Sequence, residues 1–546
     1  MSRMTRDVAL MTAGTMTSRL FGLARGILLA SVIGAAGLTA DVFQVANTLP
    51  NTLYILVGGG ILNGILVPQI VKAKLHDDGG AEFVNRIVTL TTAFLLGSTV
   101  LVTLAAPWLV HLFSDFRADA LELSTTFAYI CLPQMFFYGM YTLLGQILNA
   151  RGLFWPYLWA PVVANLVAIV GLIWFRLAGY PLGAPISQWT PAMVAILGGT
   201  ATLSIAIHAV ALIIPLRPLG FRFRPGWGLR GVGLGTSSRV AMWTFAAVAV
   251  SQLGFMVTSQ ALTRAADVGK TTGESLASRS AFDNAFLIVM LPHSLVTVSL
   301  VTALFNRIST AVAHDDAAAV RADYRRGLRT IAPILIPVVA LLAAFAPVVT
   351  SSLFIGNPTS QTNAVAQLVS WMVLGVLPYG WLYLNDRTFF AHDDGRTPFI
   401  TQVVVTSIAA LFAFAAWQGD PQLTGLLIGV GQSTAYLVGA AVGTILVHRR
   451  LGSLGMAGVL GTYARIALPA AGYAAVLAWL VARLLPDLGH TRGVTALITG
   501  GLVLAIVGVL HLTATWVTAH LLGVTEIGQA KQALLSRLPR RSRAGA

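Results

Sequence analysis

Two arginines inside an apolar segment near the start of the chain are the residues best suited to chemistry. Arg19 and Arg25 fall within residues 8–33, a stretch long enough to cross a bilayer. A charge at the bilayer centre costs roughly 2.5–3.5 kcal/mol on insertion scales, so it normally faces a polar cavity and serves a function. Guanidinium groups stay charged and suit phosphate oxygens. The segment therefore predicts a cationic site for an anionic ligand, with an ion pair between Arg25 and Asp41 as the structural alternative.

Helical geometry sets how these side chains are arranged. At 100° per residue, Ser18 and Arg25 nearly coincide on one face, whereas Arg19 lies about 100° away. The two arginines differ by ~9 Å along the helix axis. We expect them to line a wide cavity rather than one narrow stripe, with Gly22 between them as a point of bending.

Polar residues in later apolar segments give further candidates. Asp41 and Asn51 flank the second predicted span, where Asp41 is either a ligand group or a helix cap and Asn51, after Pro50, is a hydrogen-bonding group. Gly58–Gly60 favours bending or close packing equally. Arg239 starts the seventh span, where it is either an interfacial, snorkelling arginine or a second cationic group. Asp283 and Asn284 either line the second half of the protein or lie at its outer interface.

The composition places the chain in a membrane. Its 546 residues are 56% hydrophobic and only 10% charged, whereas soluble domains carry about 25% charged residues. The ten-residue alternation of a membrane β-barrel is absent, so we predict an all-α polytopic membrane protein with about fourteen transmembrane helices. The predicted spans are 8–33, 42–72, 84–110, 122–150, 156–176, 191–216, 236–262, 279–308, 330–350, 364–392, 398–418, 422–448, 460–485 and 493–522.

The distribution of basic residues predicts the orientation. With a cytoplasmic N-terminus, 25 of the 35 Lys and Arg residues fall in cytoplasmic segments and seven in outer loops. This asymmetry supports an even number of spans and two cytoplasmic termini. It also explains the net charge of +15 without nucleic-acid binding. Cys131 is the only cysteine, which excludes an intramolecular disulfide and a cysteine metal site.

Weak internal echoes indicate a repeat of six spans. TSR at 17–19 recurs as SSR at 237–239, LVPQIVKA at 66–73 resembles LFNRISTA at 304–311, and ILNARGLFWP at 147–156 resembles FFAHDDGRTP at 389–398. Parallel repeats of this kind place a substrate site between two lobes. The predicted divisions are an N-lobe at 1–216, a C-lobe at 217–450, two further helices at 451–523 and a basic cytoplasmic tail at 524–546.

The sequence offers no enzyme motif. VGKT at 268–271 lacks the first glycine of a phosphate-binding loop, because Arg264 stands there. HExxH, GxSxG and zinc-spaced clusters are also missing, so we expect a transporter without cofactors or metal. Membrane potential or an ion gradient would drive it. A sodium site could involve Asp283 or Asn385, but the sequence alone does not locate one.

Several segments together resemble a known family. They are SRLFGLAR (18–25), ADVFQVANTLPN (40–51), LVPQIVKA (66–73), LLGQILNARGLFWPYLWAPVVANL (143–166) and RTFFAHDDGRTPF (387–399). The chain resembles the MurJ/MviN lipid II flippases of the multidrug/oligosaccharidyl-lipid/polysaccharide exporter superfamily. LYILVGGGILNGILVPQ at 53–69 is most similar to actinobacterial members.

The resemblance implies a fold and a function. The fold is two six-helix lobes in a V-shaped, MATE-like arrangement, with two C-terminal helices that form a lipid groove. The function is export of the undecaprenyl-diphosphate-linked peptidoglycan precursor by alternating access, with membrane lipids and cell-wall synthesis or division proteins as further partners. By the family's motifs, the substrate-binding residues are Ser18, Arg19, Arg25, Asp41 and Asn51. Arg239, Arg387, Asp394 and Arg396 are gating or secondary residues, the last three in the tenth-span exit motif.

The chain also departs from the family pattern. Many members carry a basic and then an acidic residue after the second-span Asn, where this chain has Tyr54 and Gly59. Many also carry an arginine in the eighth span, where this chain has Leu287 before Pro292. The alternatives are therefore a transporter of another polyprenyl-diphosphate-linked glycan and a scaffold paralogue that does not transport. A cationic drug would require buried carboxylates that the first lobe nearly lacks, and an enzyme of lipid-linked sugars is least supported.

Overall fold

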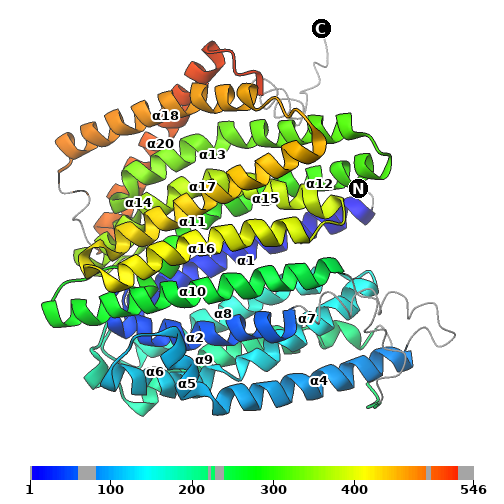
Figure 1. The fold of residues 1–546 in the computed structure, drawn as a ribbon. Helices are drawn as coiled ribbons and strands as arrows, with labels where there is room; N and C mark the ends of the chain where they lie inside the picture. The colour runs from blue at the N-terminus through cyan, green and yellow to red at the C-terminus, as the bar shows by residue number, and fades with distance from the viewer. Residues whose placement is uncertain are drawn as a thin grey trace, which may run out of the picture. The chain divides into compact units, whose positions relative to one another are not determined.

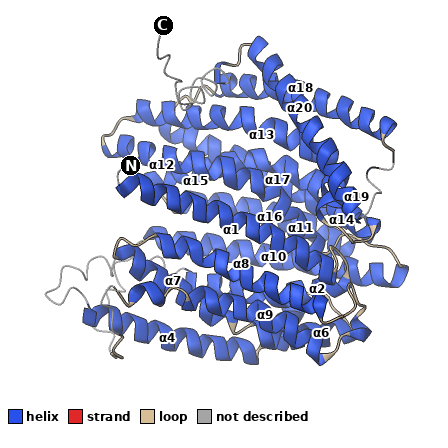
Figure 2. Ribbon diagram, turned by 180° about the vertical axis from the view of Figure 1, so that it is seen from behind, coloured by secondary structure: helices blue, strands red, loops and turns tan. Residues whose placement is uncertain are grey.

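The computed structural model describes residues 3–59, 81–218, 223–227, 239–486, 488 and 493–526, and all of its regular elements are helices (Figure 2). Within these ranges, thirteen helices or consecutive helix pairs are long and apolar enough to cross a membrane. They coincide with thirteen of the fourteen predicted spans. The second predicted span, 42–72, is described as far as residue 59, so LVPQIVKA lies outside the described residues, as do most of the SSR echo and the tail beyond Glu526.

The helices form two compact units. The first contains residues 1–284, 356–365 and 409–428, and the second contains residues 285–355, 366–408 and 429–546. Helices entirely within the first unit are α1 (Arg3–Ile33), α2 (Leu38–Tyr54), α4 (Ala81–Leu104), α5 (Ala106–Phe113), α6 (Ala118–Cys131), α7 (Gln134–Ala150), α8 (Trp155–Leu177), α9 (Pro191–Val210) and α10 (Arg239–Thr272) (Figure 1).

Helices entirely within the second unit are α12 (Val298–Ala313), α13 (Ala317–Leu353), α15 (Val376–Ala391), α18 (Met456–Leu484), α19 (Gly493–Thr495) and α20 (Gly501–Leu521). Four more contribute residues to both units, namely α11 (Arg279–Pro292), α14 (Thr359–Met372), α16 (Arg396–Gln418) and α17 (Thr424–Leu451). Single π-turns follow α2, α11 and α19, at Ile55–Gly59, His293–Thr297 and Ala496–Gly500. The predicted lobe limits at 216 and 450 remain predictions.

Small residues let α1 lie directly against α8. A Cβ on Gly14 would come within 2.9 Å of the Trp159 indole nitrogen, and one on Gly22 within 3.7 Å of the Asn165 amide nitrogen. Asn165 donates to the Ser18 carbonyl at 3.2 Å. Close approach through small residues is the usual basis of helix packing in a bilayer, where apolar burial gives little drive. Gly22 is therefore a packing residue in α1, which runs unbroken from Arg3 to Ile33.

In both units, a side-chain donor from a neighbouring helix bonds to a carbonyl that a proline has left without its helical partner. A proline removes the hydrogen bond that the carbonyl four residues earlier would accept. Pro161 in α8 frees the Tyr157 carbonyl, and the Tyr141 hydroxyl of α7 donates to it at 2.8 Å. Pro337 in α13 frees the Pro333 carbonyl, and the Trp516 indole of α20 donates to it at 2.7 Å. Lipid offers no alternative partner, so these donors fix α7 to α8 and α20 to α13.

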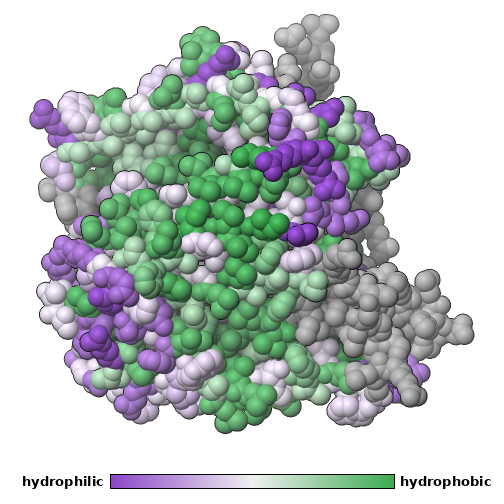
Figure 3. Space-filling model, viewed as in Figure 1, coloured by the Kyte–Doolittle hydropathy of each residue, from purple (hydrophilic) through white to green (hydrophobic). Residues whose placement is uncertain are grey.

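The long helix α13 is the centre of the second unit. Both α18 and α20 pack against it, and their apolar contacts include Ile336, Ile466 and Ala519. Its helix is interrupted at Phe345, whose φ and ψ are non-helical two residues before Pro347. On the face shown in Figure 3, apolar side chains cover the middle of the helices and hydrophilic ones gather toward their ends, as a bilayer requires.

Candidate functional site

Arg19 and Arg25 of α1 have no protein partner among the described residues. Arg19 and Arg25 are both partly exposed, and neither forms a hydrogen bond or an ion pair with any described side chain or backbone group. The predicted pair between Arg25 and Asp41 does not form, because Asp41 has other partners. The group in electrostatic range of Arg25 is the Tyr138 phenol on α7. Both guanidinium groups therefore keep their donors available for an anion.

Ser18 lies on the packed side of α1. Its carbonyl accepts from Asn165 of α8, and Gly14 and Gly22 continue the same stripe at four-residue spacing. The structure thus brings Ser18 close to α8, while Arg19 lies a further 100° around the helix. Its role as a substrate-binding residue remains a prediction.

Asp41 joins α2 to the first turn of α11. Its carboxylate, which is fully buried, accepts from the backbone N–H of Arg279 at 2.8 Å and of Ser280 at 2.7 Å, and from the Ser280 hydroxyl at 2.6 Å. A helix N-terminus carries partial positive charge and unpaired N–H groups, so it offsets the cost of burying a carboxylate. Asp41 is a helix cap, as one prediction allowed, but it caps a helix more than 230 residues away in sequence.

Asp41 begins a polar stripe along α2. Gln44, Thr48 and Asn51 follow at helical spacing, so all four side chains share one face. Gln44 donates to the Asp283 carboxylate at 3.4 Å, and Thr48 accepts from Arg279 at 3.4 Å. Asn51, further from α11, is exposed and is available to a ligand. The sequence prediction missed Gln44 and Thr48, although the spacing 41, 44, 48, 51 was the signal that identifies them.

Arg279 is the site residue that the sequence prediction did not single out. It stands at the first position of the predicted span 279–308, and in the structure it begins α11 and is 3% exposed. Its guanidinium lies 3.1 Å from the Asp283 carboxylate and 4.2 Å above the centre of the Phe255 ring of α10, a cation–π arrangement. Arg279 with Asp283, Gln44 and Thr48 is called the α11 cluster below. The four-residue spacing of Arg279 and Asp283 was the signal available.

Three further polar residues form hydrogen bonds with other groups of the protein. The Tyr54 hydroxyl, where the family carries a basic residue, donates to Thr142 at 2.7 Å, and Tyr54 is buried in the core of the first unit. Asn284 donates to the Ala35 carbonyl at 2.9 Å. Asn385 accepts from the Tyr324 hydroxyl and donates to the Ala440 carbonyl and to Thr444. These partners account for residues that the sequence left without an assignment.

Three of the four predicted gating residues lie near the end of α15 and the start of α16. Arg387 donates to the Tyr383 hydroxyl at 3.0 Å and lies over the rings of Tyr383 and Phe305. Asp394 accepts from the backbone N–H and hydroxyl of Thr397 at the start of α16, and also pairs with Arg450 at 3.1 Å. Arg396 is exposed. Arg239 is the first residue of α10, and its side chain lies outside what the structure describes.

Within the described ranges, His, Cys, Asp and Glu side chains form no group of three or more that would hold a metal. Cys131 is buried. The chemistry that remains is binding through charge and hydrogen bonds, centred on α1, α2 and α11.

Comparison with known proteins identifies the family. A family model described as "Lipid II flippase MurJ" matches residues 29–492. The chain belongs to the MurJ lipid II flippase family. The match covers α2, α11 and the α15–α16 region but begins after Arg25, so the α1 arginines are not part of it.

Individual MurJ relatives have low sequence identity to this chain, but the similarity extends over most of its length. The chain is 26% identical over 427 residues to the lipid II flippase MurJ of Burkholderia cenocepacia, which covers 76% of this chain and 79% of that protein. It is 22% identical over 541 residues to the probable lipid II flippase MurJ of Rhizobium tropici, with 96% of this chain and 95% of the relative covered.

Solved structures show the same fold. A lipid II flippase MurJ in an inward closed conformation matches 92% of this chain and 98% of its own, with a TM-score of 0.68 and 17% identity. An inward-facing multidrug resistance MATE family transporter of the MOP superfamily matches 82% and 99%, with a TM-score of 0.60 and 17% identity. The predicted all-helical, MATE-like membrane fold is confirmed, and a transporter family agrees with the expectation that the chain is not an enzyme.

Proposed function

We propose that this chain is a lipid II flippase, which moves the undecaprenyl-diphosphate-linked peptidoglycan precursor from the inner to the outer leaflet by alternating access. The observation that supports this most directly is the pair of unpartnered arginines on α1 in a member of the MurJ family. A diphosphate requires guanidinium donors, and Arg19 and Arg25 hold theirs free of protein partners within the described residues.

In this proposal the substrate-binding residues are Arg19, Arg25 and Asn51. The arginines contact the diphosphate, and the exposed amide of Asn51 donates to or accepts from the sugar–peptide head. Ser18 lies at the edge of this group and contributes through the packing of α1 on α8. Asp41 acts differently, because its carboxylate is fully engaged with α11.

Alternating access requires contacts that form in one state and break in another. We propose that the bonds from Asp41 to the first turn of α11 are such a contact, at the outer end of the helices. The bonds of Asp394 to Thr397 and Arg450 would act at the cytoplasmic end, with Arg387 and Arg396 beside them. Arg239 is proposed as a secondary cationic group, and unchanged transport by Arg239→Ala would remove it from the site.

A related function has its own support. Tyr54 and Leu287 stand where many members carry basic residues, and Arg279 is neutralised by Asp283 rather than supplying the missing charge. A site with fewer cations favours another polyprenyl-diphosphate-linked glycan as the alternative substrate. A scaffold paralogue that does not transport would tolerate loss of Arg19 and Arg25.

The finer assignments belong to the same proposal. We infer the inner membrane, cytoplasmic termini, two six-helix lobes at 1–216 and 217–450, a lipid groove formed by residues 451–523 and a basic tail at 524–546. The actinobacterial character of residues 53–69 and partnership with membrane lipids or with cell-wall synthesis and division proteins are proposed with it. Membrane potential or an ion gradient drives transport.

Complementation tests the function. The native chain, Arg19→Ala and Arg25→Ala are expressed in a bacterium depleted of its own lipid II flippase, with membrane levels matched. We expect the native chain to restore growth and both variants to fail. Leu20→Ala, an exposed apolar position of α1, is the matched control and is expected to rescue. Rescue by all four chains would contradict the arginine assignment, and no rescue by a well-expressed native chain would favour another substrate or a scaffold.

A further inference from the structure

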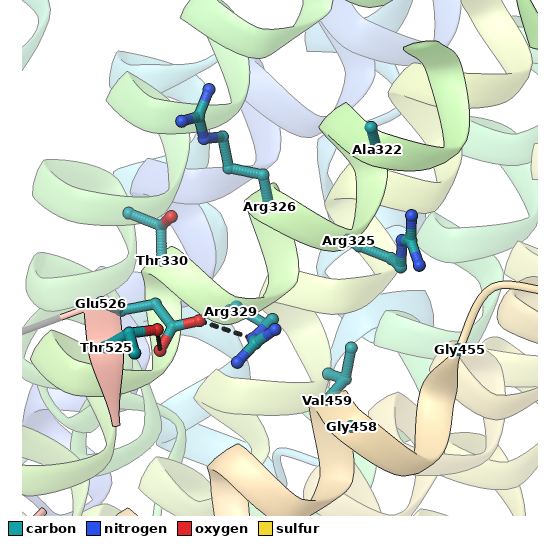
Figure 4. Close-up of a pocket in the computed structure, with 10 residues that line it drawn as sticks. All are labelled: Ala322, Arg325, Arg326, Arg329, Thr330, Gly455, Gly458, Val459, Thr525 and Glu526. Carbon is teal, nitrogen blue, oxygen red and sulfur yellow. Dashed lines mark hydrogen bonds and ion pairs between the residues drawn. The ribbon is translucent and has the colours of Figure 1, made fainter. Parts of the chain in front are cut away.

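A cavity lined by arginines lies in the second unit, apart from the α1, α2 and α11 residues described above. Its volume is about 510 Å³. Roughly the second to fourth turns of α13, the start of α18 and the segment after α20 form its walls (Figure 4). The lining residues are Ala322, Arg325, Arg326, Arg329, Thr330, Gly455, Gly458, Val459, Thr525 and Glu526.

The cavity carries more positive than negative charge. Arg329 forms an ion pair with Glu526, with Nε and Oε1 2.5 Å apart, although the N–H is not aligned for a hydrogen bond. Arg325 and Arg326 are exposed and have no hydrogen-bond or ion-pair partner in the part of the chain that the structure describes. The lining holds three guanidinium groups and one carboxylate, which leaves a surplus of two positive charges and suits an anion.

Glycines on α18 keep the cavity open. Gly455 has φ of +60°, and a Cβ there would lie 3.3 Å from Nη1 of Arg325, so this guanidinium rests against the α18 backbone. Figure 4 shows the Arg325 side chain directed toward that end of α18. A Cβ on Gly458 would meet nothing within 4 Å. The space beside Gly458 therefore belongs to the cavity and admits a group larger than a water molecule.

Three helix ends place the cavity at a membrane surface. Arg325, Arg326 and Arg329 immediately precede the apolar part of α13, while α18 begins at Met456 and α20 ends at Leu521. Leu460, Leu521 and Leu522, on the same helix ends, are 48–80% exposed and provide an apolar surface for acyl chains. A basic pocket between transmembrane helices, beside apolar surface, matches the chemistry of an anionic lipid headgroup.

We propose that this cavity binds the phosphodiester headgroup of an anionic phospholipid, with Arg325 and Arg326 as the phosphate ligands. The proposed orientation of the chain assigns the lipid to the cytoplasmic leaflet. Arg329 and Glu526 form the floor of the site, and the acyl chains lie along Leu460 and Leu521. The proposal does not use Arg19, Arg25 or Asn51, none of which lines the cavity. Its α18 and α20 residues fall within 451–523, the range proposed above for the lipid groove.

Lipid binding by purified protein tests the proposal. The full-length chain is delipidated in maltoside micelles and titrated with dioleoyl-phosphatidylglycerol or with dioleoyl-phosphatidylcholine, and bound lipid is counted by native mass spectrometry. We expect preference for phosphatidylglycerol. Arg325→Gln with Arg326→Gln should weaken it by roughly 25-fold, since each arginine near an anionic lipid contributes about fivefold. Arg224→Gln with Arg449→Gln removes the same charge from exposed residues outside the cavity and should change binding little.

A change of shape gives an independent readout. Gly458→Leu fills the cavity without changing charge, and should weaken phosphatidylglycerol binding. Gly461→Leu adds the same side chain on the same helix, where a Cβ also meets nothing within 4 Å, and should not. Equal binding by all variants would overturn the proposal. Displacement of the lipid by millimolar inorganic phosphate or pyrophosphate would also overturn it in favour of a soluble anion. Growth rescue by the parent chain is scored separately, so failure here and failure of flipping are distinguishable.

Discussion

The arginines of this protein differ in what neutralises them. Arg279 is almost completely buried and has a carboxylate, a hydroxyl and an aromatic ring around it. Arg19 and Arg25 are less buried, yet among the described residues they have no such partners. A buried charge paired with an opposite charge contributes to structure, whereas a cation left unpartnered in an apolar segment is suited to a ligand.

Removing one partner of the Arg279–Asp283 ion pair should destabilise the protein more than removing both. Asp283→Asn leaves a buried guanidinium without its counter-charge, which typically costs about 3–5 kcal/mol. Arg279→Met with Asp283→Leu removes both charges and should restore most of that loss. Thermal unfolding of the three purified proteins in one detergent measures this, with the order of Tm expected as parent, double variant, single variant. A single variant as stable as the parent would contradict the pairing.

The sequence singled out Arg19 and Arg25 because an isolated charge in an apolar run is a strong signal. It did not single out Arg279, because hydropathy places this residue at the start of a span and does not identify its partners. Its role depends on Phe255 and Thr48, which are distant in sequence, and no local pattern contains that information.

Among the helices, α2 and α11 are joined by polar bonds in a setting where apolar packing gives little specificity. Asp41 accepts three hydrogen bonds from the first turn of α11. One and two turns further along α2, Gln44 contacts Asp283 and Thr48 contacts Arg279. Charge-assisted bonds to neutral groups contribute about 1.5–3 kcal/mol each where water is excluded. These bonds stabilise the state in which α2 and α11 are in contact, and separating the two helices would break them together.

Asp41→Asn should loosen this contact without removing its volume. An amide keeps one acceptor oxygen but lacks the charge that suits the α11 N-terminus. With Cys131 replaced by Ala and a cysteine at Ala281, which is fully buried, labelling by a membrane-impermeant maleimide should become several-fold faster in the Asp41→Asn background. Asp119→Asn, an exposed carboxylate at the start of α6, should leave the rate unchanged. Equal rates in both backgrounds would show that Asp41 does not hold α11.

Hydropathy predicted the helices better than their contacts. Thirteen spans agree with the structure because twenty apolar residues are a long, redundant signal. The limits were less accurate: α10 continues ten residues beyond the predicted end at 262. The carboxylate of Asp41 was predicted to bind a ligand or to cap a helix, and only the folded chain shows which helix it caps.

At the scale of the whole molecule, orientation is the property on which the proposed sites depend. Cationic groups that face the cytoplasm are available to a precursor made there, and the same groups facing outward would not be. The excess of Lys and Arg in one set of loops supports cytoplasmic termini.

Cysteine accessibility measures this orientation. Trp227 and Leu182 are exposed loop residues, 72% and 46% exposed, on opposite sides in the proposed topology. In intact cells carrying Cys131→Ala, a membrane-impermeant maleimide should label Leu182→Cys and not Trp227→Cys. Both should be labelled after the membrane is permeabilised, which serves as the control. Labelling of Trp227→Cys in intact cells would invert the topology and move the anionic-lipid site to the outer leaflet.

The whole fold was predicted through resemblance rather than through physics. Motifs such as ADVFQVANTLPN identified a family whose solved members share the fold. Periodicity and hydropathy alone gave a helical membrane protein and a span count, because tertiary arrangement depends on contacts such as Trp516 with Pro333, which join residues 183 positions apart.

The bond between Trp516 and the Pro333 carbonyl constrains how such chains diverge. Pro337 without an indole at 516 leaves a bare carbonyl in lipid, and the indole without the proline loses its acceptor to the regular helix. Either change alone is unfavourable, whereas both together restore an ordinary helix pair. Positions 337 and 516 should therefore vary together among relatives, as should 161 and 141, where Pro161 and Tyr141 form the corresponding pair. A relative should therefore keep both members of a pair or have replaced both.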